Sequence, residues 1–180
     1  MKKDENKFWD SAWRSEKLMK ETEMVDYYIP KTSVQFSYKL LDNLNGKKLL
    51  EIGCGSGYET IEFCRKGAQV TAIDLSTESI NQAKERCKKN NIENVHIENM
   101  NAESLQFEDN SFDRVYINKV LLHTDPDTVL KECIRVLKKE GILVINGMLK
   151  HWLFAFPSKR RATTTRHRQS GMLAALGSLS

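Results

Sequence analysis

The stretch LLEIGCGSGYE, residues 49–59, decides the fold, because an apolar run gives way to three alternating glycines and then to polar residues. Its first half predicts a buried strand, and its last residues predict the start of a helix. Gly53, Gly55 and Gly57 permit a sharp turn between the two and let a ligand approach the backbone closely. Tyr58 stands where a dinucleotide-binding loop would place its last glycine. The ligand of this loop must therefore be inferred from the residues that accompany it.

Length and cysteine content indicate a single domain in a reducing compartment. A chain of 180 residues can bury a core of its own without covalent staples. The N-terminus is charged rather than apolar, and no apolar run reaches the roughly 20 residues that span a bilayer. We therefore expect a cytoplasmic protein with no membrane span. The cysteines form no CxxC pair and have no histidine at metal-ligand spacing, so we expect neither a metal nor disulfides; they are Cys54, Cys64, Cys87 and Cys133.

The positive net charge of +4 comes from the C-terminal tail alone. Of the 28 basic residues, six lie in residues 150–180, which contain no acid, so residues 1–149 carry a small net negative charge. An all-basic tail is more often solvated than a nucleic-acid contact, and no RNA-recognition motif accompanies it. Binding of nucleic acid is therefore not expected. The tail is predicted to be truncated or to have little order of its own.

From residue 48 onward, β-branched runs alternate with helical patterns, which is typical of a parallel sheet with crossover helices. Ser76 suits a helix N-cap, Pro126 a first helical position and Gly67 a C-terminal cap. The pattern predicts an α/β fold with helices on both faces of a mostly parallel sheet. The predicted strands are residues 48–53, 68–74, 94–99, 111–119 and 142–147, and the predicted helices between them are residues 58–66, 77–87 and 126–140.

Candidate ligand-binding residues gather at the carboxyl ends of the predicted strands, where ligands bind in an open α/β sheet. The glycines follow the first strand. Asp74 ends the second strand, 21 positions after Gly53, which is close to the spacing of a ribose-binding acid. Its carboxylate can accept hydrogen bonds from both hydroxyls of a ribose. A tight turn would explain the glycines alone, and a favourable helix dipole would explain Asp74 alone. Their conjunction favours a nucleoside site.

These segments resemble the class I S-adenosylmethionine-dependent methyltransferases, in the branch related to ubiquinone and menaquinone biosynthesis. LLEIGCGSG looks like the first motif of the family and VTAIDLS like the second. NAESLQFEDNSFD resembles the stretch into strand four, and LLHTDPDTVLKECIRVLKKEGILVI the helix and strand that follow. The resemblance implies a Rossmann-like class I methyltransferase fold with a core over residues 46–149. Residues 1–45 would form an N-terminal helical cap, and residues 150–180 the basic tail.

The resemblance also implies S-adenosyl-L-methionine as cofactor and a position for each of its parts. The ribose would bind Asp74, and Asn101 stands where the family often has an aspartate near the adenine amino group, so hydrogen bonding would remain while the charge is lost. Leu121 and His123 would face the substrate. The implied cofactor-binding residues are Glu51, Gly53, Cys54, Gly55 and Gly57 in the first motif, Asp74 and Leu75 in the second, then Asn101, Ala102, Glu103 and Asn118.

The implied reaction is an in-line displacement that transfers a methyl group to a small-molecule acceptor. The cofactor supplies the activated methyl group, and the protein aligns the reactants and excludes water. A sulfonium nucleoside has no pyrophosphate, which explains why the loop lacks the last glycine of a dinucleotide motif. His123 is the only histidine near the predicted site and is the candidate general base, although a histidine in such a loop is more often structural.

The C-terminal end departs from the pattern of the family, whose members usually continue with a further helix and a β-hairpin. Residues 150–180 show no alternating strands joined by a turn, so the sheet is predicted to be shortened. Its fifth strand would then be an exposed edge that favours a homodimer. Three interpretations follow. The leading one is an active small-molecule methyltransferase, the second a weak or inactive domain that binds cofactor or protein, and the last an enzyme that methylates RNA.

Overall fold

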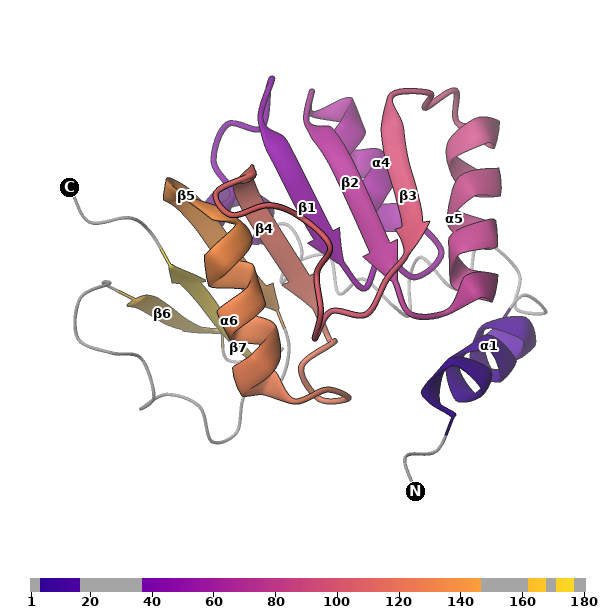
Figure 1. Ribbon diagram of the computed structural model, residues 1–180. Helices are drawn as coiled ribbons and strands as arrows, with labels where there is room; N and C mark the ends of the chain where they lie inside the picture. The colour runs from indigo at the N-terminus through magenta and orange to yellow at the C-terminus, as the bar shows by residue number, and fades with distance from the viewer. Residues whose placement is uncertain (1–3, 17–36, 147–161, 168–170, 177–180) are drawn as a thin grey trace.

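The computed structural model describes residues 4–16, 37–146, 162–167 and 171–176, and a seven-stranded sheet lies at its centre (Figure 1). The strand order is β3-β2-β1-β4-β5-β7-β6, and β1 to β5 are parallel. The predicted α/β class is therefore confirmed. The strands are β1 (Lys48–Ile52), β2 (Gln69–Asp74), β3 (Val95–Asn99), β4 (Phe112–Asn118), β5 (Leu137–Asn146), β6 (Ala162–His167) and β7 (Gly171–Leu176). The helices are α1 (Glu5–Glu16), α4 (Tyr58–Arg65), α5 (Thr77–Lys89) and α6 (Pro126–Val136).

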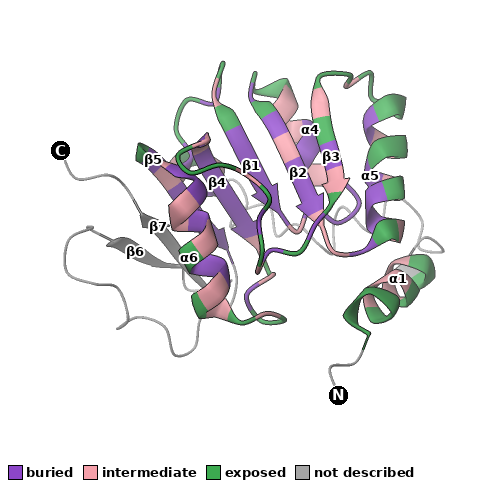
Figure 2. Cartoon of the chain, in the orientation of Figure 1, coloured by how far each residue is buried: buried purple, intermediate pink, exposed green. Residues whose placement is uncertain are grey.

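Helices cover both faces of the sheet, with α4 and α5 on one face and α6 on the other. The central strands β1 and β4 are buried along most of their length, whereas the edge strand β3 and the outer faces of the helices are more exposed (Figure 2). In β1, only Lys48 is exposed, as expected for a strand covered on both sides. Phe63 of α4 and Tyr116 of β4 lie edge to face in the core, with ring centroids 5.0 Å apart.

Capping residues start and stop the helices where the sequence predicts. The Ser76 hydroxyl accepts a hydrogen bond from the Ser79 N–H at 3.2 Å and begins α5. Gly67 follows α4 with a φ of +85°, a conformation that favours glycine. Pro126 is the first residue of α6. The Ser76 cap sets the N-terminus of α5 directly after the carboxyl end of β2.

The boundary between α6 and β5 differs from the prediction. The helical pattern predicts a helix to residue 140, but α6 ends at Val136, and Leu137 already pairs with Phe112 of β4. The register between the two strands then shifts before Ile142. Leu137 is buried in the strand. Its apolar side chain fits a helical stripe equally well, so the pattern alone could not separate helix from strand.

The C-terminal tail contributes two strands that the sequence analysis did not predict. β7 pairs antiparallel with β5, and β6 pairs antiparallel with β7. The prediction of a shortened sheet with β5 at its edge is therefore wrong. The overlooked signal is the run of threonines at 163–165 in β6, because β-branched residues favour strands. A homodimer through β5 loses its basis, since β7 occupies that edge, and dimerisation itself stays a prediction.

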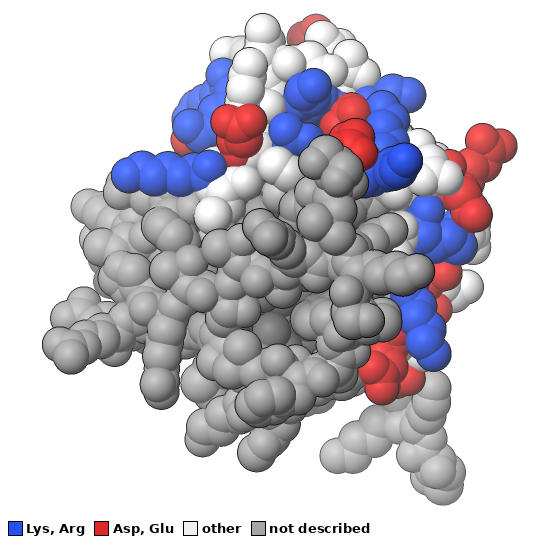
Figure 3. All heavy atoms as spheres, turned by 90° about the vertical axis from the view of Figure 1, so that its left-hand side faces the viewer, with Lys and Arg blue, Asp and Glu red and all other residues white. Residues whose placement is uncertain are grey.

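Charges on the described surface are mixed rather than segregated. On the face in Figure 3, the described lysines and arginines lie among acidic side chains. Arg65, for example, pairs with Glu62 at 3.2 Å. Within the ranges that the structure describes, no helix is long and apolar enough to cross a membrane, and no cluster of three or more His, Cys, Asp or Glu side chains is arranged to hold a metal ion.

Candidate functional site

A cavity of about 390 Å³ lies at the carboxyl ends of β1, β2 and β4. Its volume is within the range of small-molecule sites. His123, the candidate general base, lies in the wall of this cavity. The structure therefore brings together residues that the sequence spreads over four separate segments. Nine of the predicted cofactor-binding residues line the cavity: Gly53, Cys54, Gly55, Asp74, Leu75, Asn101, Ala102, Glu103 and Asn118.

The glycine loop forms the floor of the cavity between β1 and α4. Gly53 and Gly55 have φ angles of +76° and +52°, which strain any other residue. A Cβ atom on Gly53 would lie 2.2 Å from Cγ2 of Val120, and one on Gly55 would lie 2.7 Å from the ring of Trp13. Burial raises the pKa of the Cys54 thiol between them, which keeps that side chain uncharged. The loop therefore presents backbone, not side chains, to a ligand.

Two predicted residues, Gly57 and Glu51, do not line the cavity. A Cβ on Gly57 would lie 3.0 Å from Cα of Ala83, so this glycine lets α4 pack closely on α5. Glu51 is buried behind the loop, where it accepts a hydrogen bond from the Thr60 hydroxyl at 2.6 Å. Burial and the nearby Glu59 carboxylate raise the pKa of Glu51 well above its usual value, which favours its protonated form.

Backbone donors hold the Asp74 carboxylate at the end of β2. Its Oδ2 accepts from the Gly55 N–H and its Oδ1 from the Ser76 N–H, both at 2.9 Å. Burial raises the pKa of Asp74, and these hydrogen bonds act in the opposite direction. Each oxygen keeps a further lone pair, so the carboxylate can still accept from two ligand hydroxyls. Asp74 thereby couples the glycine loop to β2 and faces the cavity at the same time.

The segment after β3 closes the side of the cavity beyond β2. The Asn101 side-chain oxygen accepts from the Glu103 N–H at 2.9 Å, which forms a local turn. The Glu103 carboxylate in turn accepts from the Asp125 N–H at 2.8 Å, at the start of α6. Met100 and Ala102 add apolar surface to this wall. The wall can therefore cover a flat apolar group and offer an acceptor oxygen beside it.

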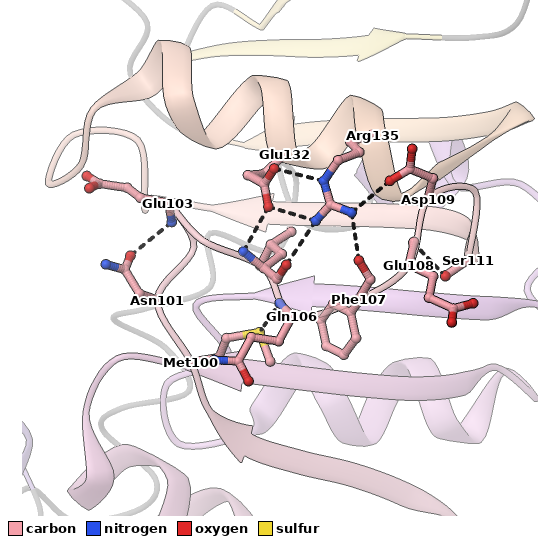
Figure 4. A network of polar contacts seen from close by, with 11 residues as sticks. Met100, Asn101, Glu103, Gln106, Phe107, Glu108, Asp109, Ser111, Glu132 and Arg135 are labelled. Carbon is pink, nitrogen blue, oxygen red and sulfur yellow. Dashed lines mark hydrogen bonds and ion pairs between the residues drawn. The ribbon is translucent and has the colours of Figure 1, made fainter.

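Arg135 on α6 anchors this segment from outside the cavity (Figure 4). Its guanidinium donates to the carbonyls of Phe107 at 2.7 Å and Leu105 at 2.9 Å. It also pairs with the carboxylates of Glu132 and Asp109. These contacts occupy all five of its N–H donors. No sequence motif indicated this network, which fixes the chain that leads away from the cavity wall.

We expect that Arg135→Lys lowers the free energy of unfolding by about 1–2 kcal/mol, because an ammonium cannot reproduce the forked contacts. Urea unfolding followed by far-UV circular dichroism measures the change. The matched control is Arg65→Lys on α4, whose exposed ion pair should contribute less than about 0.5 kcal/mol. Equal effects of the two substitutions would contradict the anchoring role of Arg135.

Helix α1 forms the remaining wall of the cavity. Trp9 and Trp13 line it, and Trp9 packs edge-on against the His123 ring with centroids 4.7 Å apart. Trp13 lies against Gly55, so α1 covers the glycine loop. Figure 1 shows α1 below the arrowheads of the strands, beside the lower end of α5. No role was predicted for these two tryptophans, because local sequence patterns carry no signal for a contact between α1 and the glycine loop.

Polar contacts with α5 hold α1 in this position. The Asp10 carboxylate accepts hydrogen bonds from the Ser76 hydroxyl and from the Glu78 N–H at 3.1 Å. The Gln82 side chain donates to the Trp13 carbonyl at 3.1 Å. Ser76 also contacts Asp74 through its N–H. The lid formed by α1 is thereby joined to the part of the site that can bind a ribose.

A buried polar cluster lies at the end of β4. The Glu59 carboxylate accepts from the Tyr116 hydroxyl at 2.6 Å and from the Asn118 amide at 2.9 Å. Burial raises the pKa of Glu59, whereas these hydrogen bonds and the Lys119 ammonium lower it. Glu59 lines the cavity, although sequence reasoning missed it. Leu121, expected to face the substrate, instead packs in the core.

The sequence matches the methyltransferase domain family over residues 50–145. A relative from Psychrobacter cryohalolentis, described as a ubiquinone biosynthesis O-methyltransferase, is 34% identical over 118 residues. The match covers 62% of this chain and 46% of that protein. The chain spans about half the length of curated relatives that it matches, such as the Psychrobacter protein.

Solved methyltransferase structures share the fold. A SAM-dependent methyltransferase from Aquifex aeolicus aligns with a TM-score of 0.65 at 18% identity, over 88% of this chain and 97% of that chain. Geranyl diphosphate C-methyltransferase from Streptomyces coelicolor, solved with S-adenosyl-L-homocysteine, aligns with a TM-score of 0.62 at 20% identity, over 64% of this chain and 50% of that chain. At these identities the likeness concerns the fold.

Proposed function

Because the chain belongs to the methyltransferase domain family, we propose that it transfers the methyl group of S-adenosylmethionine to a small organic acceptor. One observation carries this proposal: the Asp74 carboxylate, which accepts hydrogen bonds from two backbone N–H groups, faces a cavity beside the glycine loop. S-adenosylmethionine is the cofactor that the family match supports.

The cavity offers suitable partners for each part of this cofactor. Gly53 and Gly55 line the cavity without side chains of their own, which suits close contact between a ligand and their backbone. Asp74 suits the ribose, and Leu75 with Ala102 suits the adenine ring. Asn118 Oδ1 is buried and has no hydrogen-bond partner among the described residues, so it suits a donor from the ligand. The residues present therefore fit the cofactor.

The chemistry asks little of the protein beyond alignment. The bound cofactor supplies a methyl group activated on a sulfonium sulfur. Trp9 and Trp13 on α1 cover the cavity, which keeps water from the reacting groups and holds the acceptor in line. His123 lines the same cavity and can take a proton from the acceptor. We therefore place the methyl acceptor in the region between α1 and the end of β4.

The alternative of an inactive cofactor-binding domain rested on a missing C-terminal hairpin. β6 and β7 are present and extend the sheet beyond β5, so that argument no longer applies. The similarity to ubiquinone biosynthesis O-methyltransferases supports a small acceptor with a nucleophilic oxygen. Methylation of RNA remains the least supported reading, because it rests on the basic tail, whose basic residues lie largely outside the described ranges, and no RNA-recognition motif accompanies the tail.

Labelled methyl transfer tests the proposal. The protein is incubated with S-adenosylmethionine carrying a labelled methyl group and with small-molecule extract or RNA in separate reactions. We expect label in a small molecule and none in RNA, and no transfer by the Asp74→Ala variant. Label in RNA alone would show that the methyl acceptor is RNA and not a small molecule. Absence of label from every fraction, although cofactor binds, would contradict methyl transfer.

A further inference from the structure

We propose that Glu59, together with Asn118, binds the ammonium group on the methionyl portion of the cofactor. The inference rests on the proposed function, since it concerns how the same cavity holds S-adenosylmethionine. The family resemblance assigned a carboxylate on this side of the cofactor to Glu51. The structure buries Glu51 behind the loop and places the Glu59 carboxylate in the cavity instead.

The order of the strands determines which end of the cofactor meets Glu59. In the sheet, β1 lies between β2 and β4. Asp74 ends β2 and Asn118 ends β4, so the two sites are separated by two strand spacings, about 10 Å. With the ribose on Asp74 and the adenine beyond it near β3, the methionyl chain has to cross Gly53 toward β4. It then ends beside Asn118 and Glu59.

The side-chain oxygens of Glu59 and Asn118 are acceptors suited to a cation. Each Glu59 oxygen accepts one hydrogen bond, from Tyr116 or from Asn118, and keeps a lone pair for another. The Asn118 amide nitrogen donates to Glu59, which leaves its oxygen as the orphaned buried acceptor. An ammonium group has three N–H donors and no acceptor, so it can satisfy Asn118 and Glu59 together.

The charge balance of the cluster agrees with this assignment. The pKa of Glu59 is raised by burial, and its hydrogen bonds from Tyr116 and Asn118 and the Lys119 ammonium offset this effect only in part. A ligand cation at hydrogen-bond distance would favour the ionised carboxylate. Two other acids of the lining are already engaged by backbone N–H groups, Asp74 by Gly55 and Ser76, and Glu103 by Asp125.

Binding of two ligands to the Glu59→Gln variant tests the inference. S-adenosylhomocysteine carries the amino-acid portion, whereas methylthioadenosine has the same nucleoside and thioether but lacks the ammonium and carboxylate. We expect the variant to bind S-adenosylhomocysteine about tenfold more weakly than the wild type, the size of one charge-assisted hydrogen bond. Its affinity for methylthioadenosine should be unchanged. Isothermal titration measures both.

The control is Glu62→Gln, an exposed carboxylate one turn along α4, which should change neither affinity. Asn118→Ser provides a second variant if Glu59→Gln does not fold, and it should show the same selective loss for S-adenosylhomocysteine. Equal weakening of both ligands, or of neither, would overturn the inference. Slower turnover with unchanged affinity for S-adenosylhomocysteine would also overturn it, because Glu59 would then act on the acceptor. If the wild type binds neither ligand, the proposed function itself fails.

Discussion

Replacing Asp74 with alanine is expected to weaken binding of S-adenosylmethionine by about 100-fold or more. Hydrogen bonds to a charged acceptor contribute about 1.5–3 kcal/mol each, and two ribose hydroxyls can bind this carboxylate. The substitution also removes the acceptor that ties Gly55 and Ser76 together, so the loop loses its shape as well as its ligand contact. Isothermal titration with S-adenosylmethionine measures the loss.

A matched control separates binding from general damage to the fold. Asp113 on β4 is also partly buried and accepts from a backbone N–H, that of Lys48 at 3.0 Å, but it lies at the opposite end of the strands. Asp113→Ala should leave the affinity for S-adenosylmethionine unchanged. An Asp74→Ala variant that folds and binds like the wild type would remove the ribose-binding role.

The second large effect is expected for Gly53→Ala, which should lower the free energy of unfolding by about 2–4 kcal/mol. A left-handed backbone costs an L-residue about 1–2 kcal/mol. The added methyl group would also collide with Val120, a β-branched side chain that cannot turn away freely, and such overpacking costs about 1–3 kcal/mol. Chemical denaturation at equilibrium measures the change.

Gly46 provides the control, because its φ is +70° but a Cβ there would meet nothing within 4 Å. Gly46→Ala should therefore show only the backbone cost. Val120→Ala in the Gly53→Ala background should recover part of the stability, since it removes the atom in conflict. If Gly53→Ala and Gly46→Ala lower the free energy of unfolding equally, the close approach between the glycine loop and Val120 does not contribute to the effect of Gly53→Ala.

Local pattern and spacing were sufficient to predict the core of the fold. β1, the glycine loop and α4 follow from one contiguous stretch, and Ser76 and Pro126 mark helix starts by their own chemistry. Asp74 was predicted because its distance from Gly53 is set by one helix and one strand. The alternation of side chains along β1 explains why Glu51 does not line the cavity: it faces the same side as Leu49, toward α4.

The rest of the site depends on contacts between distant segments. Trp13 meets Gly55 only after α1 packs against α5 near the carboxyl ends of the strands, and Arg135 reaches Phe107 from another element. No residue pattern encodes such pairs in a single sequence. The β6–β7 pairing was missed for a different reason, because the run of threonines at 163–165 was not recognised as a strand. Glu59 reads as an ordinary helix residue until Asn118 is placed beside it.

The most direct test of the account is titration of the wild-type protein with S-adenosylmethionine and, separately, with a nicotinamide dinucleotide. Its central claim is that the loop of residues 53–57 receives a sulfonium nucleoside and not a diphosphate. We predict saturable one-to-one binding of S-adenosylmethionine and no binding of the dinucleotide. Binding of the dinucleotide without binding of S-adenosylmethionine would contradict the claim.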